Sequence, residues 1–62
     1  MDIIWLEHLG SWRAITPKYT LEVWELNGGY SWAAYNADGE YVFAGHERFL
    51  DAAKREAVQK AC

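Results

Sequence analysis

The sequence predicts an α+β fold: an antiparallel β-meander of three to five strands with one C-terminal α-helix packed on one face. Two turn signals, Asn27-Gly28 and Asp38-Gly39, separate runs rich in β-branched and aromatic residues; the first can supply the positive φ angles of a tight turn, and the second suits a type I′ turn. After residue 45 the apolar spacing changes from two to about 3.6 residues, which is typical of an amphipathic helix. With 62 residues, the chain is expected to form a single domain, residues 1–62.

The first 18 residues have the least regular pattern. Residues 3–7 and 11–16 both have strand composition, His8-Leu9-Gly10 suits a turn between them, and Pro17 closes the second run. We expect these two strands to cover the sheet face that the helix leaves open. If they do not cover it, that face is expected to be an interface.

The central strands are expected at residues 19–26, 30–36 and 41–45. With the two turns as placed, Val23 lies opposite Trp32, and the alternation of side chains then separates two faces. The face expected to pack against the helix carries Leu21, Val23, Trp32, Ala34 and Phe43. The other face carries Glu22, Trp24, Leu26, Ala33, Tyr35, Val42 and Ala44.

The helix is expected at about residues 47–61. Its sheet-facing stripe repeats every four residues and consists of Phe49, Ala53, Ala57 and Ala61. Because alanine is small, the helix axis can approach the strands closely, with Trp32 and Phe43 filling the space between. No strong N-cap residue precedes this segment, so its first turn is poorly defined by the sequence.

Composition excludes several classes of protein. The chain is 52% hydrophobic and 16% aromatic, which indicates a folded domain. Its single cysteine, Cys62, can close no internal disulfide, and together with His8 and His46 it falls short of four zinc ligands, so no metal or cofactor is expected. No apolar run is long enough to cross a membrane, and the N-terminus lacks a signal-peptide pattern, so a cytoplasmic location is expected.

The candidate catalytic residues do not form a recognisable set. Serine occurs only at Ser11 and Ser31, and Ser31 has no histidine near it in the sequence. A nucleophile needs a base within reach and a group that orients the base. We therefore expect no catalytic residues and no enzymatic activity.

Charge argues against nucleic-acid binding through the sheet. Residues 19–45 contain no Lys or Arg, and their acids are Glu22, Glu25, Asp38 and Glu40. Phosphates would be repelled by such a surface. The alternative that stays open is a small nucleic-acid-binding regulator using the basic residues of the expected C-terminal helix, which are Arg48, Lys54, Arg55 and Lys60. These residues alternate with acids, which is more typical of a solvated helix face.

A protein partner fits the composition better. A chain this short cannot bury all of its Trp and Tyr side chains, and these residue types are enriched in protein interfaces. The sequence therefore predicts a non-enzymatic protein–protein interaction module that binds through an acidic, aromatic sheet surface. The candidate protein-binding residues are Trp24, Tyr35, Glu22, Val42 and Trp12. The partner is expected to be a host protein or a second copy of the chain, in a structural homodimer.

Several short motifs carry a resemblance to a known family. They are Trp12, Leu21-x-Val23, Gly29-Tyr30-x-Trp32, Asp38-Gly39, Gly45 and Phe49-x-x-Ala52-Ala53-Lys54-x-x-Ala57. Through them the chain resembles short uncharacterised domains of phage and prophage genomes of proteobacteria. The resemblance implies a phage-encoded protein in the host cytoplasm, such as an inhibitor of a host defence nuclease of the anti-CRISPR or anti-restriction type. The chain is also similar to the arm-binding domain of phage integrases, which implies DNA contact through the sheet, but it lacks the sheet arginines and lysines of that pattern.

Overall fold

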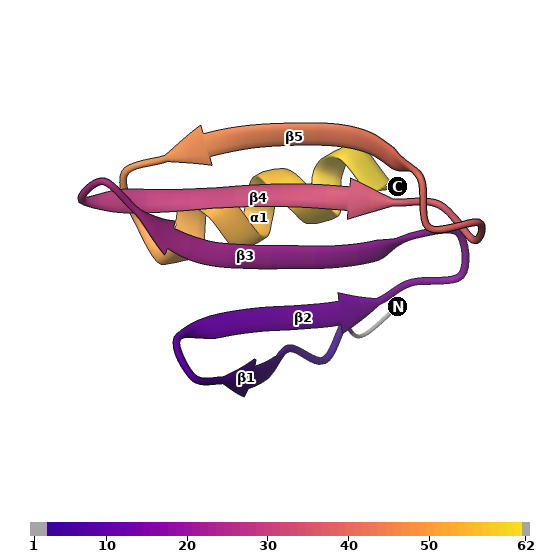
Figure 1. Ribbon diagram of the computed structural model, residues 1–62, viewed down its shortest axis with the longest axis horizontal. Helices are drawn as coiled ribbons and strands as arrows, with labels where there is room; N and C mark the ends of the chain where they lie inside the picture. The colour runs from indigo at the N-terminus through magenta and orange to yellow at the C-terminus, as the bar shows by residue number, and fades with distance from the viewer. Residues whose placement is uncertain (1–2, 62) are drawn as a thin grey trace.

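A computed structural model describes residues 3–61 and confirms the expected fold class. Five antiparallel strands form a single meander in the order β1-β2-β3-β4-β5, and one helix follows them (Figure 1). The elements are β1 (Leu6–His8), β2 (Ser11–Ile15), β3 (Thr20–Leu26), β4 (Gly29–Tyr35), β5 (Tyr41–Glu47) and α1 (Leu50–Ala61). No helix within the described residues is long and apolar enough to cross a membrane.

The N-terminal hairpin extends the sheet and does not cover it. Strand β2 pairs along its whole length with β3, from Ser11 opposite Trp24 to Ile15 opposite Thr20. The expectation that these strands cover the second face is therefore wrong. The physical reason is the short turn between β2 and β3, in which the Thr16 amide donates to the Tyr19 carbonyl at 2.8 Å. A turn this tight returns the chain beside β3, and the chain does not pass over the sheet.

The expected register of the central strands is confirmed. Val23 lies opposite Trp32, and the β3–β4 turn has the positive φ angles of Asn27 (52°) and Gly28 (79°) that a type I′ turn requires. In the β4–β5 turn only Gly39 has a positive φ (81°), so the expected type I′ turn is wrong there. The Gly39 amide donates to the Asn36 carbonyl at 3.0 Å, which is a type I turn followed by a left-handed glycine.

This longer turn shifts the pairing of β4 and β5. Ala34 lies opposite Phe43, whereas Tyr35 lies opposite Tyr41, so Val42 is an extra residue in a β-bulge. From Phe43 to Glu47 the pairing with β4 is regular. The bulge therefore affects only the first residues of β5.

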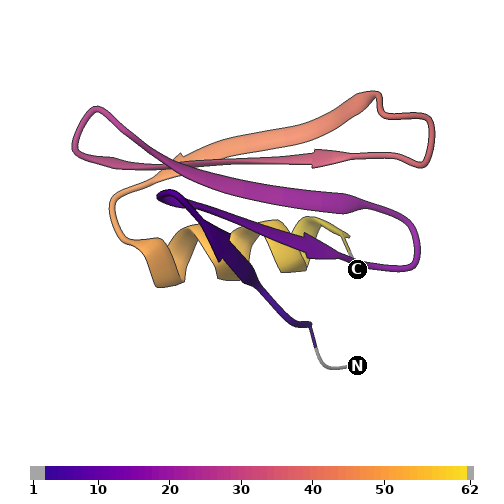
Figure 2. The ribbon, with the colours of Figure 1, turned by 60° about the horizontal axis from the view of Figure 1, so that its bottom comes forward.

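Helix α1 packs across β3, β4 and β5 on one face of the sheet, as Figure 2 shows. Its buried residues are Ala53, Ala57 and Ala61, as expected. The helix begins at Leu50 because β5 continues through Glu47, which pairs with Tyr30. Phe49 precedes the helix, its carbonyl accepts the Ala53 amide at 3.0 Å, and its side chain is 67% exposed. Its expected place in the buried stripe is therefore wrong.

The core lies between the helix and the sheet, and its largest member is Trp32. This side chain is 3% exposed and lies directly over Gly45, its partner on β5. A Cβ atom at Gly45 would lie 2.6 Å from Trp32 Nε1, so the close approach requires glycine. The indole Nε1 is buried without a hydrogen-bond partner among residues 3–61.

Candidate protein-binding face

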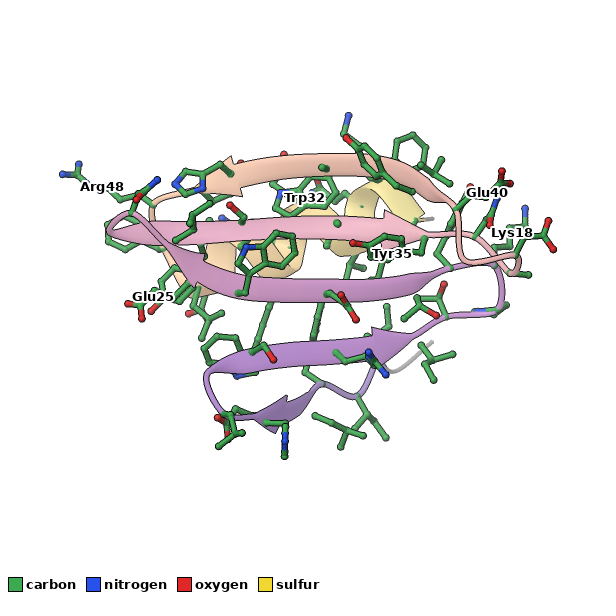
Figure 3. The ribbon with its side chains drawn as sticks, viewed as in Figure 1. Lys18, Glu25, Trp32, Tyr35, Glu40 and Arg48 are labelled. Atoms are coloured by element: carbon green, nitrogen blue, oxygen red, sulfur yellow. The ribbon has the colours of Figure 1, made fainter. Side chains whose placement is uncertain are left out.

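The sheet face opposite α1, called the open face below, is covered by none of the described elements. Figure 3 views this face with α1 behind the sheet. The strand register places its side chains in two central rows. One row consists of His8, Ser11, Trp24, Ser31 and His46, and the next of Leu6, Arg13, Glu22, Ala33 and Ala44.

Four of the five expected binding residues belong to this face. Trp24, Tyr35 and Glu22 are half-buried on it, and Val42, at the bulge beside Tyr35, is 39% exposed. Trp12 is the exception, because it lies opposite Val23 and so shares the helix-facing side. Its ring makes an edge contact with Tyr30, with centroids 5.9 Å apart. Trp12 is nevertheless among the residues that line the hollow described next, and its role in protein binding stays a prediction.

A hollow of about 480 Å3 lies on the open face over β1, β2 and β3. Leu6 and Trp24 give it apolar walls, while His8, Arg13 and Glu22 line it with polar groups. A second hollow of about 340 Å3 adjoins it, sharing Leu6 and Arg13. Three large aliphatic residues line the second hollow and are strongly exposed: Ile4 (73%), Leu6 (69%) and Ile15 (76%).

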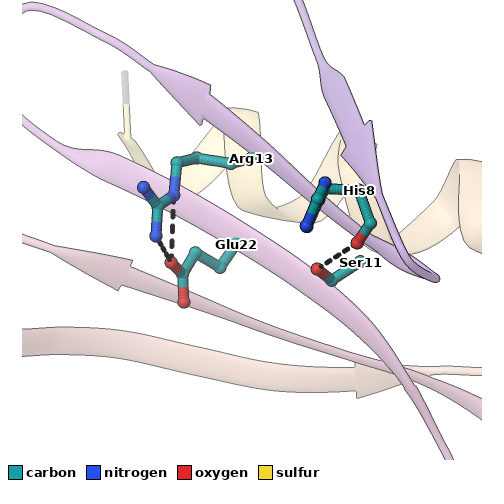
Figure 4. Close-up of polar contacts among 4 residues, drawn as sticks. All are labelled: His8, Ser11, Arg13 and Glu22. Atoms are coloured by element: carbon teal, nitrogen blue, oxygen red, sulfur yellow. Dashed lines mark hydrogen bonds and ion pairs between the residues drawn. The ribbon is translucent and has the colours of Figure 1, made fainter.

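The charges of the open face are paired. Arg13 donates through Nη2 at 2.7 Å and through Nε at 3.2 Å to one carboxylate oxygen of Glu22 (Figure 4). The two side chains are 64% and 31% exposed, so the pair is partly open to water. No other Lys, Arg, Asp or Glu lies in the two central rows.

The centre of the open face is therefore not acidic, contrary to the expectation from residues 19–45. Glu25 lies near one end of the sheet and Glu40 near the other, as Figure 3 shows, and Asp38 is in the β4–β5 turn. The acids of residues 19–45 are close in the sequence, whereas Arg13, which neutralises Glu22, lies on the neighbouring strand and outside that segment.

The structure brings together a serine and a histidine that sequence reasoning left apart. Ser31 Oγ and His46 Nδ1 share a hydrogen bond of 2.9 Å, and the imidazole tautomer decides which of them donates. With Asp38-Gly39 as the turn, the sequence places Ala34 opposite Phe43. Extending that pairing by three residues along both strands sets Ser31 opposite His46, and this was the signal that could have found the pair.

This pair lacks the rest of a nucleophilic site. No carboxylate among residues 3–61 bonds to His46, Ser31 is only 9% exposed, and neither residue lines the hollows. A serine nucleophile needs a base that is itself oriented and an acceptor site for the developing oxyanion. The observed contact is a cross-strand hydrogen bond of the kind that stabilises a sheet.

Metal ligands do not converge within residues 3–61. His8 and His46 stand on the two outer strands of the sheet, which strand spacing puts roughly 19 Å apart. No group of three or more His, Cys, Asp or Glu that could hold a metal ion occurs in the described part of the chain. Cys62 lies outside the described residues.

The basic residues do not form one surface either. The Lys54 ammonium lies 5.7 Å from the ring centroids of both Trp5 and Trp12, so this charge is held against aromatic rings. Arg48 precedes the helix and stands at the end of β5. Arg55 and Lys60 are exposed on α1.

Comparison of the chain with family models, with curated proteins and with solved structures found no match.

Proposed function

We propose that this protein is a non-enzymatic protein-binding module that acts through the open face of its sheet. One observation carries the proposal: this face is left uncovered although it bears Trp24, Tyr35 and three strongly exposed aliphatic side chains around a pair of hollows. Contiguous apolar surface of this kind is a marker of protein interaction sites.

The chemistry of the hollow favours one kind of partner. Its apolar walls, Leu6 and Trp24, suit an aliphatic or aromatic side chain projecting from another polypeptide. His8 and the Arg13–Glu22 pair can exchange hydrogen bonds with the backbone on either side of that anchor. We therefore expect recognition by one buried apolar anchor with polar contacts at the rim.

The resemblance implies a more specific role, a phage-encoded inhibitor that acts on a host defence nuclease in the host cytoplasm. An inhibitor that occupies a basic nucleic-acid groove gains affinity from negative charge. The Arg13–Glu22 pair removes that charge from the centre of the open face. In this role the protein would therefore contact an apolar protein surface of the nuclease, and it would not imitate DNA.

The alternative, a nucleic-acid-binding regulator, has less support. It requires a cluster of free cations on α1, but Lys54 lies against two tryptophan rings. Titration with duplex DNA at low and moderate salt tests this alternative. We expect no salt-sensitive binding, whereas micromolar binding that weakens steeply with salt would favour the regulator.

Photo-crosslinking followed by affinity measurement tests the protein-binding proposal. Benzoylphenylalanine replaces Tyr35 on the open face, or Gln59 on the exposed side of α1 as the control. The partner crosslinked in native host cells is then purified and titrated calorimetrically with the unmodified protein. We expect crosslinking from position 35 only.

The titration is repeated with Trp24→Ala and with Gln59→Ala as the matched control. Loss of an aromatic anchor costs about 2 kcal/mol, so we expect Trp24→Ala to weaken binding by about thirtyfold and Gln59→Ala to leave it unchanged. If a correctly folded Trp24→Ala variant binds with wild-type affinity, or if position 59 crosslinks as well as position 35, the open face is not the binding surface.

A further inference from the structure

Strand β5 is a long outer strand with a free edge. It has seven residues, whereas β1, at the opposite edge of the sheet, has three. One side of β5 pairs with β4, and no strand within residues 3–61 pairs with its other side. An outer strand directs about half of its backbone N–H and C=O groups outward, where they can pair with another strand.

Strand β5 carries few of the features that usually block such pairing: it has a bulge at its first residues and one acid, Glu47, at its end. The strand contains no lysine and no proline, and α1 packs against the face of the sheet and leaves the edge uncovered (Figure 2). The bulge at Val42 lies at one end, and the residues from Phe43 to Glu47 form a regular ladder. The edge is therefore accessible to a strand of matching length and chemistry.

The charges at the two ends of β5 are complementary to each other. Glu40 precedes the strand, Arg48 follows it, both are exposed, and they stand at opposite ends in Figure 3. Arg48 forms no ion pair among the described residues. One carboxylate oxygen of Glu40 accepts the Asn36 side-chain amide at 3.1 Å, and the other has no partner among residues 3–61.

These features match a second copy of the same strand. Antiparallel pairing of two β5 strands about a two-fold axis at Ala44 aligns all seven strand residues. It also sets Glu40 of one copy opposite Arg48 of the other, once at each end of the junction. A shift of the axis by one residue in either direction loses both Glu40–Arg48 pairs and leaves strand residues unpaired.

The same arrangement accounts for two exposed aromatic side chains. Tyr41 is 65% exposed at the start of β5, and Phe49 is 67% exposed just beyond its end. Because the two strands run in opposite directions, Phe49 of one copy comes toward the Tyr41 end of the other. The junction would thus remove apolar surface from water at both ends.

We propose that two copies of this chain associate through antiparallel pairing of β5, centred on Ala44, to form one continuous sheet with five strands from each copy. The association uses the edge of the sheet and leaves the open face free. It is therefore independent of the proposed function, and its tests use the purified chain alone.

Disulfide trapping tests the symmetry axis. In a Cys62→Ser background, Ala44→Cys places two thiols at the axis, where paired Cα atoms of antiparallel strands are roughly 4.5–5.5 Å apart and within disulfide range. Ala37→Cys, in the exposed β4–β5 turn, is the matched control because the axis does not bring it near its own copy. We expect covalent dimers from Ala44→Cys only. Equal crosslinking, or none from a folded Ala44→Cys variant, would overturn the proposal.

A charge exchange tests the register, with sedimentation equilibrium as the readout. Arg48→Glu and Glu40→Arg each place like charges opposite one another, so each should raise the dimer dissociation constant by about tenfold. The double variant restores opposite charges and should recover wild-type association. A wild-type chain that stays monomeric, single variants that associate normally, or a dimer that dissociates on Trp24→Asp instead would each refute pairing through β5.

Discussion

Replacement of Gly45 by alanine tests the contact that organises the core. The added Cβ atom would lie 2.6 Å from Nε1 and 2.7 Å from Cε2 and Cζ2 of Trp32. These atoms belong to a rigid indole ring that is 3% exposed, so no flexible chain end can move aside. Relief requires an unfavourable rotamer of Trp32 or a shift of the β5 backbone away from β4.

The expected cost follows from two opposing effects. Overpacking a core in this way destabilises by about 1–3 kcal/mol, while replacing glycine by alanine within a strand returns about 0.5–1 kcal/mol. Because the clash is with a rigid, buried ring, the upper part of the overpacking range applies, and we expect Gly45→Ala to lower the free energy of unfolding by about 1–2 kcal/mol net. At the ~0.05–0.15 kcal/mol per residue typical of native proteins, this is a large part of the stability of so short a chain.

Urea unfolding, followed by far-UV circular dichroism at low protein concentration, measures this change. The cycle is completed by Trp32→Phe and the double variant, because a phenylalanine ring lacks the indole atoms that the Cβ would meet. We expect the double variant to be more stable than the two single effects predict by about 1 kcal/mol. Additive effects, or a Gly45→Ala variant within about 0.5 kcal/mol of wild type, would refute the contact as the cause.

Three further changes can be measured by the same unfolding assay. The side chains of Arg13 and Glu22 are 64% and 31% exposed, so water weakens their ion pair. The double-mutant cycle of their alanine variants should therefore give a coupling energy of at most about 0.5 kcal/mol, which decreases as salt is added. A coupling energy above about 1.5 kcal/mol would contradict this. Asn36→Ala removes the side-chain oxygen that accepts two backbone amides of the β4–β5 turn, at 2.9 and 3.0 Å. It should lower the free energy of unfolding by about 1 kcal/mol. An unchanged urea midpoint would mean that the turn is stable without these two hydrogen bonds. Phe49→Ala should lower the free energy of unfolding of the monomer by less than about 0.5 kcal/mol, because Phe49 is exposed. Ala57→Leu, at a fully buried position, should lower it by about 2 kcal/mol. The reverse order would mean that the helix buries a different face from the one observed.

The central part of the fold could be predicted because local and cross-strand signals agree there. Asn27-Gly28 permits the positive φ angles of a two-residue turn, which fixes Val23 opposite Trp32. Once that pair is fixed, the two-residue alternation assigns the side chains of β3 and β4 to their faces. The buried face of the helix could also be predicted, because Ala53 and Ala57 are four residues apart, which is close to one helical turn.

The N-terminal strands could not be placed in this way. Pro17-Lys18 links β2 to β3 and is not one of the Gly-containing dipeptides that fix a two-residue hairpin, so the sequence did not fix the register that puts Trp12 opposite Val23. An error of one residue in such a register exchanges the two faces. The start of the helix was missed because the pairing of Glu47 with Tyr30 extends β5, and a cross-strand pairing of this kind leaves no helix or turn signal in the local sequence.

The candidate site was predictable in position but not in charge. The open face and its Trp24 and Tyr35 follow from the alternation within β3 and β4. The neutral centre depends on Arg13 reaching Glu22 from the neighbouring strand at 2.7 Å. The hollow depends on Leu6 of β1, whose place beside β2 was not expected.

The two proposals have a joint geometric consequence. A two-fold axis through Ala44 and perpendicular to the sheet turns each copy without inverting it, so both open faces lie on one side and both helices on the other. The hollows over β1–β3 are then at the two far ends of the joined sheet, since β5 is at its centre.

A partner that carries two anchors at that separation would bind both ends at once, and its affinity would fall on Arg48→Glu even though this residue lies outside the hollows. A partner with a single anchor would not respond to that change, so the response to Arg48→Glu distinguishes a two-site partner from a one-site partner without altering the open face.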